Sequence, residues 1–307
     1  KEHKTVNFLG KKGIFFGLSL AVILAGFITM GVYKMNTGDA LTYSLEFKGG
    51  TSTNVEFNED MSIEELDEKV VPIIEEISKD ANVQTQKVQG SNQVIFKSAT
   101  LDVSQREELN SRLEEKFGVD PEKITAETIS STISSEMRTG AVSAVVVSTV
   151  LMLLYVWFRF KDVRFGASSV AALVHDVLVV LAFYAVARVS VGNTFIACML
   201  TIVGYSINAT IVIFDRIREN MTSYKTKEEL AAIVNRSISQ TLSRSIFTSL
   251  TTFIMVAVLY ILGVSSIKEF ALPLMVGIAC GTYSSICLAS AFWYLLRTRV
   301  GGKKAEK

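Results

Sequence analysis

The sequence predicts an α-helical membrane protein with six transmembrane helices and one external α+β domain after the first helix. Three observations lead to this fold class. The 307 residues are 49% hydrophobic with a mean hydropathy of +0.36, which is too apolar for an ordinary soluble domain. The apolar residues gather in six long runs of the kind that cross a bilayer as helices. The charged residues, 20% of the chain, lie between those runs, and many lie in residues 38–138.

Residues 1–37 are predicted to form the N-terminus and the first transmembrane helix. A basic segment, residues 1–12, precedes the apolar run Gly13–Val32. A basic flank is also typical of a signal peptide, but this run is too long and no small-x-small cleavage site follows it cleanly. We therefore interpret it as a membrane anchor.

Residues 38–138 are predicted to form a separate external domain. They contain 21 acidic and 10 basic residues, a net charge of −11. Alternating polar and apolar side chains predict four strands, Leu41–Phe47, Ser52–Phe57, Val83–Val88 and Gln93–Lys97. Two capping boxes, Ser62 with Glu65 and Ser104 with Glu107, predict helices that end near Ser78 and Phe117. The order ββαββα predicts a small α+β domain, a split βαβ or ferredoxin-like variant. A polar, Ser-rich helix, Ser130–Arg138, then leads into the membrane.

Residues 139–296 are predicted to form a bundle of five further membrane helices. The apolar runs are Gly140–Phe158, Phe165–Ala187, Thr194–Phe214, Phe247–Leu262 and Ala271–Leu295. Short loops join spans two and three, three and four, and five and six, so those helices are expected to be antiparallel neighbours. A basic tail, residues 297–307, follows.

The basic residues predict the orientation in the membrane. They concentrate between spans two and three, between spans four and five, and in the tail, whereas the opposite side offers Arg188 and Lys268. The positive-inside rule then places both termini in the cytoplasm and the acidic domain outside.

An ionisable pair, His175-Asp176, lies within the third apolar run. Asp176 is 11 residues from Phe165, about 16 Å into the helix, where an ionised carboxylate costs on the order of 2.5–3.5 kcal/mol. Such a carboxyl group either couples to a proton or ion, which we favour, or joins helices by hydrogen bonds. Because His175 and Asp176 point about 100° apart, His175 either orients Asp176 or faces another helix.

The fourth run carries a second polar set along Gly204–Asn220. Tyr205, Asn208 and Thr210 either line a wet path beside Asp176 or form interhelical hydrogen bonds. At the end of this run, Asp215 and Arg216 precede Arg218 and Glu219, and their spacing is typical of a solvated ion cluster at a helix end.

Spans five and six carry small and hydroxylated side chains. Ser245 and the stretch Thr248–Thr252 either bond to their own helix carbonyls or face the Asp176 path. Gly277, Gly281 and Ser284 allow close helix approach, and we expect such small-residue faces to pack against a partner with matching spans.

Three stretches together resemble the SecF family. They are His175-Asp-Val177, the long pattern of Gly204–Asn220, and Phe47-Lys-Gly-Gly-Thr51 after the first span. The resemblance covers the whole chain and implies six spans of the resistance-nodulation-division type in a bacterial cell (inner) membrane. It also implies use of a proton or sodium gradient in late preprotein export, with Asp176 as the coupling carboxylate and Arg216 in the accompanying charged set. Many relatives read Asn-Asp-Thr where this chain has Asn208-Ala-Thr210, so the stoichiometry and the ion stay open.

The resemblance also implies partners. They are SecD, fused or separate, the Sec translocation channel, YajC-like and YidC-like accessory membrane proteins, an unfolded preprotein and membrane lipid, with no nucleic acid. The chain opens Lys-Glu-His-Lys, which is similar to the second half of a fused SecD–SecF polypeptide.

Two other functions compete with protein export. An exporter of lipids or small molecules usually has two large external domains and twelve spans, and an intramembrane aspartyl protease needs two carboxylates at one site. Asp176 and Asp215 differ in depth by about 16 Å, so no enzyme is expected. The chain has two histidines, and its three cysteines form no spaced pattern, so no cofactor or metal is expected.

Overall fold

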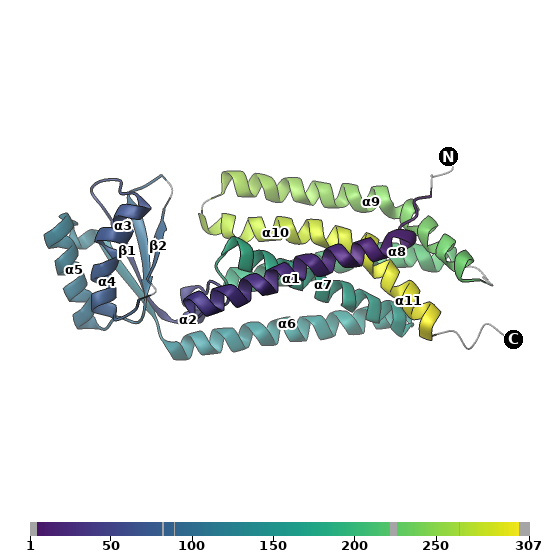
Figure 1. Ribbon diagram of the computed structural model, residues 1–307, viewed down its shortest axis with the longest axis horizontal. Coiled ribbons are helices and arrows are strands. Elements are labelled where there is room, and N and C mark those ends of the chain that lie inside the picture. The colour runs from purple at the N-terminus through teal and green to yellow at the C-terminus, as the bar shows by residue number, and fades with distance from the viewer. Residues whose placement is uncertain (1–4, 82, 89, 222–225, 264, 301–307) are drawn as a thin grey trace. The chain divides into compact units, whose positions relative to one another are not determined.

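A computed structural model describes residues 5–81, 83–88, 90–221, 226–263 and 265–300, and most of the predicted basic tail, residues 301–307, lies outside them (Figure 1). The chain divides into two compact units. One comprises Thr42–Val142 together with Ser190–Asn193, and the other comprises the remaining segments. We call them the external unit and the membrane unit and describe each by itself.

The external unit is built on a four-stranded antiparallel sheet of order β2-β3-β1-β4. Its strands are β1 (Gly50–Glu56), β2 (Gln84–Lys87), β3 (Gln93–Ser98) and β4 (Ile124–Ile129). Its main helices are α3 (Ile63–Lys69), α4 (Val71–Ser78) and α5 (Val103–Phe117). This βαββαβ order confirms the ferredoxin-like fold. The sequence does not predict β4, the last strand of this order, because Glu127 and its neighbours show no clean alternation of buried and exposed side chains.

The first predicted strand, Leu41–Phe47, is wrong. Residues Leu45–Lys48 form the short helix α2, and Tyr43 makes a single parallel bridge to Val191 instead of joining the sheet. The Ser44 amide donates to the Val191 carbonyl at 2.9 Å, so a loop far along the chain decides this conformation. Gly50 then starts β1 with φ of +126°, a backbone conformation that glycine adopts without strain.

The two predicted helices of the external unit form, but with corrections. The capping box of Ser62 and Glu65 is confirmed, although the helix is divided into α3 and α4. Pro72 at the start of α4 has no amide hydrogen to continue the preceding ladder, which explains the break. The cap of α5 is Asp102 with Gln105, not Ser104 with Glu107. The Ser104 hydroxyl instead donates to Asp102 Oδ1 at 2.7 Å.

The core of the external unit lies between one face of the sheet and the helices. Val55 and Phe96 from the sheet and Leu66, Ile74 and Leu113 from the helices are each at most 1% exposed. All members of this apolar cluster lie between Val55 and Ile124. The unit therefore carries its own hydrophobic core, which is the requirement for folding as a domain.

The membrane unit contains six helices long and apolar enough to span a bilayer among the residues described, as the sequence predicted. They are α1 (Lys12–Thr37), α6 (Ser131–Phe160), α7 (Val163–Ala187), α8 (Asn193–Asn220), α9 (Lys227–Leu262) and a last span. The last span consists of α10 (Ser265–Ser284), a π-helical segment (Ser285–Ala289) and α11 (Ser290–Val300). Figure 1 shows α10 beside α7 and α9, and α1 along α7.

Glycine lets two helix pairs of this unit approach closely. A Cβ on Gly26 of α1 would lie 2.6 Å from the Cα of Ala182 on α7. Gly277 and Gly281 of α10 face Ile202 and Ser206 of α8. The expectation that Gly277, Gly281 and Ser284 pack against a separate partner is therefore wrong, because α8 covers the two glycines and Ser284 bonds to Asp176 of α7 in the same chain.

Substitution of Gly26 tests the close contact between α1 and α7. We expect Gly26→Ala to lower the free energy of unfolding by about 1–3 kcal/mol because the added methyl group overpacks this contact. The measurement is denaturant unfolding of the full chain in mild detergent. Gly31→Ala in the same helix is the control, since nothing lies within 4 Å of its added Cβ. Equal stability of the two variants would show that α1 and α7 are not in close contact.

Acidification tests the capping of α5. The backbone amide of Gln105 donates to Asp102, and this bond together with the Ser104 hydroxyl holds the pKa of Asp102 below its usual value of 3.8. Because the unfolded chain then takes up the proton first, the stabilisation is present above pH 3.8 and is lost as the pH falls through the folded-state pKa. We expect residues 42–142 to fold alone and to be more stable than their Asp102→Asn variant at pH 7.

The difference in unfolding free energy between these two fragments should shrink steadily below pH 4. The measurement is urea unfolding monitored by circular dichroism. Asn keeps a capping acceptor but does not titrate, so the comparison cancels the general effect of neutralising an acidic domain. A difference that is constant from pH 7 to pH 3 would contradict the assignment of the cap.

Candidate functional site

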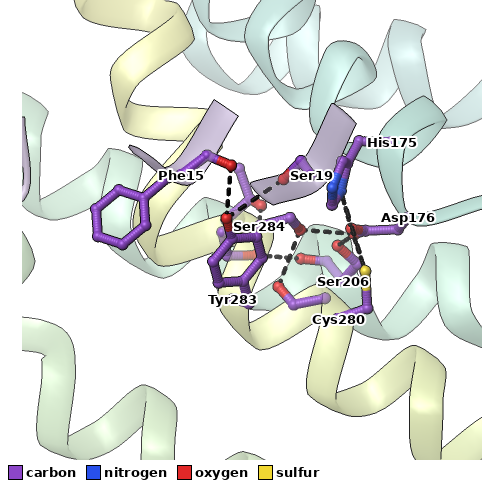
Figure 2. Close-up of polar contacts among 11 residues, drawn as sticks. Phe15, Ser19, His175, Asp176, Ser206, Cys280, Tyr283 and Ser284 are labelled. Atoms are coloured by element: carbon purple, nitrogen blue, oxygen red, sulfur yellow. Dashed lines mark hydrogen bonds and ion pairs between the residues drawn. The ribbon is translucent and has the colours of Figure 1, made fainter. Parts of the chain in front are cut away.

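Asp176 is the buried centre of a polar cluster in the membrane unit. Its side chain is fully buried on α7, and both of its carboxylate oxygens have partners (Figure 2). The hydroxyl groups of Ser206 and Ser284 donate to Oδ2 at 2.5 and 2.7 Å. The thiol of Cys280 donates to Oδ1 at 3.3 Å, and Nδ1 of His175 lies 2.9 Å from the same atom. Three helices, α7, α8 and α10, therefore meet at one carboxyl group.

His175 orients Asp176, which was one of the two alternatives that the sequence left open. Its ring is 8% exposed, and its Nδ1 contacts Asp176 Oδ1 although the two residues are adjacent on the helix. Its other nitrogen, Nε2, is buried and has no hydrogen-bond partner within the described structure. The imidazole therefore has one nitrogen on the carboxylate and one that is free to take a ligand or a proton.

Local packing explains why Ser206 and Ser284 reach Asp176. Gly281 lies against Ser206, so α8 and α10 approach closely at this level. Directly after Ser284 the helix widens into the π-helical segment, a feature that is frequent at functional sites. Ser285, the first residue of that segment, pairs with Thr210 at 2.8 Å and donates to the Ser206 carbonyl. Thr210 is thus an interhelical hydrogen-bonding residue, one level away from Asp176.

This arrangement can hold a proton or a cation inside an otherwise apolar bundle. A carboxylate accepts hydrogen bonds from hydroxyl and thiol groups, and such bonds to a charged acceptor are short and strong. A protonated carboxyl group is also accommodated, because each hydroxyl group can rotate to accept instead. The number of hydrogen bonds that Asp176 accepts therefore depends on whether α8 and α10 stay in contact with α7.

Tyr205 and Asn208 lie on a different side of α8 from Ser206. With Arg244 and Ser245 they line a small cavity of about 70 Å³ between α8 and α9. The hydroxyl groups of Tyr205 and Ser245 have no hydrogen-bond partner there in the part of the chain that the structure describes. The geometry does not bring Tyr205 or Asn208 into hydrogen-bond contact with Asp176.

Most hydroxyl groups of span five bond to their own helix. Thr248, Thr251 and Thr252 each donate to a backbone carbonyl three or four residues earlier. Ser249 instead lies 2.6 Å from the hydroxyl of Thr282 on α10. These residues support the packing of α9 and do not reach Asp176.

Asp215 and Arg216 belong to a polar cluster at the far end of α8. Asp215 pairs with Arg159 of α6 at 2.9 Å. Arg216 donates to Gln240 of α9 at 2.8 Å and pairs with Glu219. The Arg159–Asp215 pair joins the ends of α6 and α8, and the Arg216–Gln240 bond joins α8 to the middle of α9. Asp215 shares no site with Asp176. The ion cluster expected from spacing alone is therefore present: Asp215, Arg216 and Glu219 are in ion pairs, and Arg218 lies over the ring of Phe160.

Sequence reasoning missed three members of the Asp176 cluster. Ser206 was overlooked within its stretch, Cys280 was set aside for want of a spaced pattern, and Ser284 was interpreted only as a small packing residue. A signal was available, because Cys280 and Ser284 are four residues apart and so lie on one helix face. The partner helix for that face is information that the sequence alone does not carry.

The fold and the site define a multi-pass α-helical membrane protein with one α+β domain and a buried, hydrogen-bonded carboxyl group in its bundle. The family model described as protein export membrane protein SecD/SecF, C-terminal, matches residues 109–299. The protein translocase subunit SecF of Sebaldella termitidis is 36% identical over 96% of this chain and 93% of its own. The chain belongs to the SecF family.

Fused relatives match over their SecF-like part. The SecDF of Thermus thermophilus is 36% identical over 98% of this chain, which covers 40% of that longer protein. A crystal structure of SecDF from that genus, titled as a translocon-associated membrane protein, has a TM-score of 0.78 at 35% identity and 96% coverage of this chain. These comparisons make the chain a Sec protein-export accessory subunit of a bacterial membrane, and they do not favour an exporter of lipids or small molecules.

Proposed function

We propose that this subunit uses the proton or sodium gradient to assist late preprotein translocation, with Asp176 as the coupling group. One observation carries the proposal: a fully buried carboxyl group whose four partners come from its own helix and from two neighbouring helices. Ionisable side chains inside a membrane bundle are costly and mark ion pathways. A purely structural contact between α7, α8 and α10 does not require a titratable group.

Helix movement provides the coupling step in this proposal. While Ser206 and Ser284 donate to Oδ2, the ionised carboxylate is stabilised. If α7 separates from α8 and α10, those bonds are lost. In this proposal, alternating between the two arrangements loads a proton from one side of the membrane and releases it to the other.

The other predicted site residues have supporting roles in this proposal. His175 orients the carboxyl group through Nδ1. Tyr205 and Asn208 line the cavity beside α9, which is wide enough for water, since a molecule of liquid water takes about 30 Å³. Asp215 joins the ends of α6 and α8 through Arg159, and Arg216 joins α8 to α9 through Gln240. The chain works as a transporter subunit in this proposal, which the translocase-subunit names of its relatives support.

The partners proposed are SecD, fused or separate, and the Sec translocation channel. YajC-like and YidC-like accessory membrane proteins, an unfolded preprotein and lipid complete the set. Fused SecDF relatives support SecD, since their chains continue well beyond the matched region. Large apolar side chains are exposed along α6, among them Val146, Leu151 and Trp157, and suit lipid or a partner helix. The −11 net charge of residues 38–138 suits contact with polar, unfolded segments.

Replacing Asp176 with Asn tests the coupling role. Asn keeps the size and most hydrogen bonds of the carboxyl group but does not titrate, so we expect normal amounts of inserted protein with loss of gradient-dependent export. The measurement is preprotein translocation into membrane vesicles with an imposed proton gradient, an imposed sodium gradient, or none. The two gradients identify the ion.

Glu228→Gln is the control for this measurement, because Glu228 is an exposed carboxylate at the start of α9. Its stimulation by the gradient should equal that of the parent. If Asp176→Asn also responds as the parent does, Asp176 has a structural role and the coupling proposed here is wrong.

Both termini are proposed to be cytoplasmic, with residues 38–138 on the external side. We expect a single cysteine introduced at Glu107 of α5 to react with a membrane-impermeant maleimide in spheroplasts or protoplasts, whose cell membrane is intact. A cysteine introduced at Glu228 should react only after the membrane is permeabilised. The reverse labelling pattern would overturn the orientation that the positive-inside rule predicts.

A further inference from the structure

Three different metal-ligating groups meet inside the membrane unit. They are Nδ1 of His175, a carboxylate oxygen of Asp176 and Sγ of Cys280, and the three atoms lie within 4.8 Å of one another. All three residues are buried, on α7 and α10 (Figure 2). Imidazole, carboxylate and thiol groups are the ligands that zinc-class cations prefer.

The distances between these atoms suit a tetrahedral zinc-class ion. Zinc bonds of about 2.0–2.3 Å to N, O and S place tetrahedral ligands about 3.3–3.6 Å apart. The structure has 4.0 Å from Cys280 to His175, 3.3 Å from Cys280 to Asp176 and 2.9 Å from His175 to Asp176. Each separation needs a change of only about 0.3–0.5 Å to coordinate one ion.

Charge balance selects a divalent cation. On binding, the Cys280 thiol releases its proton to solvent, and the resulting thiolate and the Asp176 carboxylate together carry two negative charges. A divalent ion with these ligands and a neutral imidazole is electrically neutral, which the apolar bundle tolerates. A monovalent ion is already balanced by the Asp176 carboxylate alone, so it leaves the thiol protonated and does not use Cys280 as a thiolate ligand.

The surroundings provide a fourth ligand and room for rearrangement. The Ser284 hydroxyl is already 2.7 Å from Asp176, and it or a water molecule can complete the tetrahedron. His175 and Cys280 also line an apolar groove of about 450 Å³ together with Ser19 and Tyr283. The unpartnered Nε2 of His175 lets the ring reorient without breaking another hydrogen bond.

We propose that His175, Asp176 and Cys280 form a binding site for a thiophilic divalent cation of the zinc class. A bound cation occupies the carboxylate and fixes α7 to α10, so it inhibits the coupled movement. This inhibitory consequence rests on the proposed function, whereas binding itself does not.

Cobalt(II) chloride titrated into the purified full chain in detergent tests the binding. Thiolate coordination produces a charge-transfer band in the near ultraviolet, and tetrahedral coordination produces intense visible bands, so the spectrum reports ligand type and geometry without any activity measurement. We expect one equivalent of cobalt per chain and displacement by zinc.

The three cysteines of the chain supply matched controls. The charge-transfer band should be absent in Cys280→Ser and retained in the double variant Cys198→Ser with Cys287→Ser, in which Cys280 is the remaining thiol. Gel filtration of each variant checks that the fold is kept. If Cys280→Ser does not stay folded, retention of the band by the double variant decides the question.

Absence of the band from the parent chain would overturn the metal site, and so would its persistence in a folded Cys280→Ser variant. Either result leaves the gradient assay of Asp176→Asn unaffected. The metal site and the coupling role therefore fail independently.

Discussion

The buried carboxyl group of Asp176 is the constraint on which the membrane unit depends. Placing it in an apolar bundle costs several kcal/mol unless donors surround it. The donors come from α8 and α10, so those two helices must lie within hydrogen-bond distance of α7. Gly281 makes this approach possible because a larger side chain would press on Ser206. One polar side chain thus fixes the relative positions of three spans, and small residues around it make those positions sterically possible.

Outside this cluster, one end of the membrane unit is held by aromatic contacts and ion pairs. Near the ends of α6 and α8, stacked and edge-to-face contacts join Phe160, Phe165, Phe214 and Trp293. Beside them, the pairs of Asp215 with Arg159 and of Arg216 with Glu219 are partly exposed and contribute modestly to stability. Aromatic side chains therefore pack this end of the bundle, whereas the helices around Asp176 are joined by hydrogen bonds that can be exchanged. A movable polar level beside a rigid apolar end is what the proposed coupling requires.

The external unit is held together by an apolar core of its own. Its ferredoxin-like sheet buries one face against α3, α4 and α5, and its core draws on no residue of the membrane unit. The loop Ser190–Asn193 belongs to this unit as well, since Val191 bonds to Thr42 and Ser44 and the Asn193 amide donates to Glu46. Tyr43 therefore pairs with Val191 of this loop instead of continuing the sheet.

The sequence by itself determined the six spans, the α+β insert and the importance of Asp176, because each rests on local composition. Long apolar runs must cross the membrane, and a lone carboxylate within one of them stands out whatever its neighbours are. The sequence also placed the capping box at Ser62, whose partner Glu65 is three residues away. Tertiary structure decided which side chains surround Asp176, which face of α8 carries Tyr205 and Asn208, and what Gly277 and Gly281 pack against. Those contacts join residues up to 108 positions apart, and their geometry depends on helix rotation and approach, which no single segment encodes.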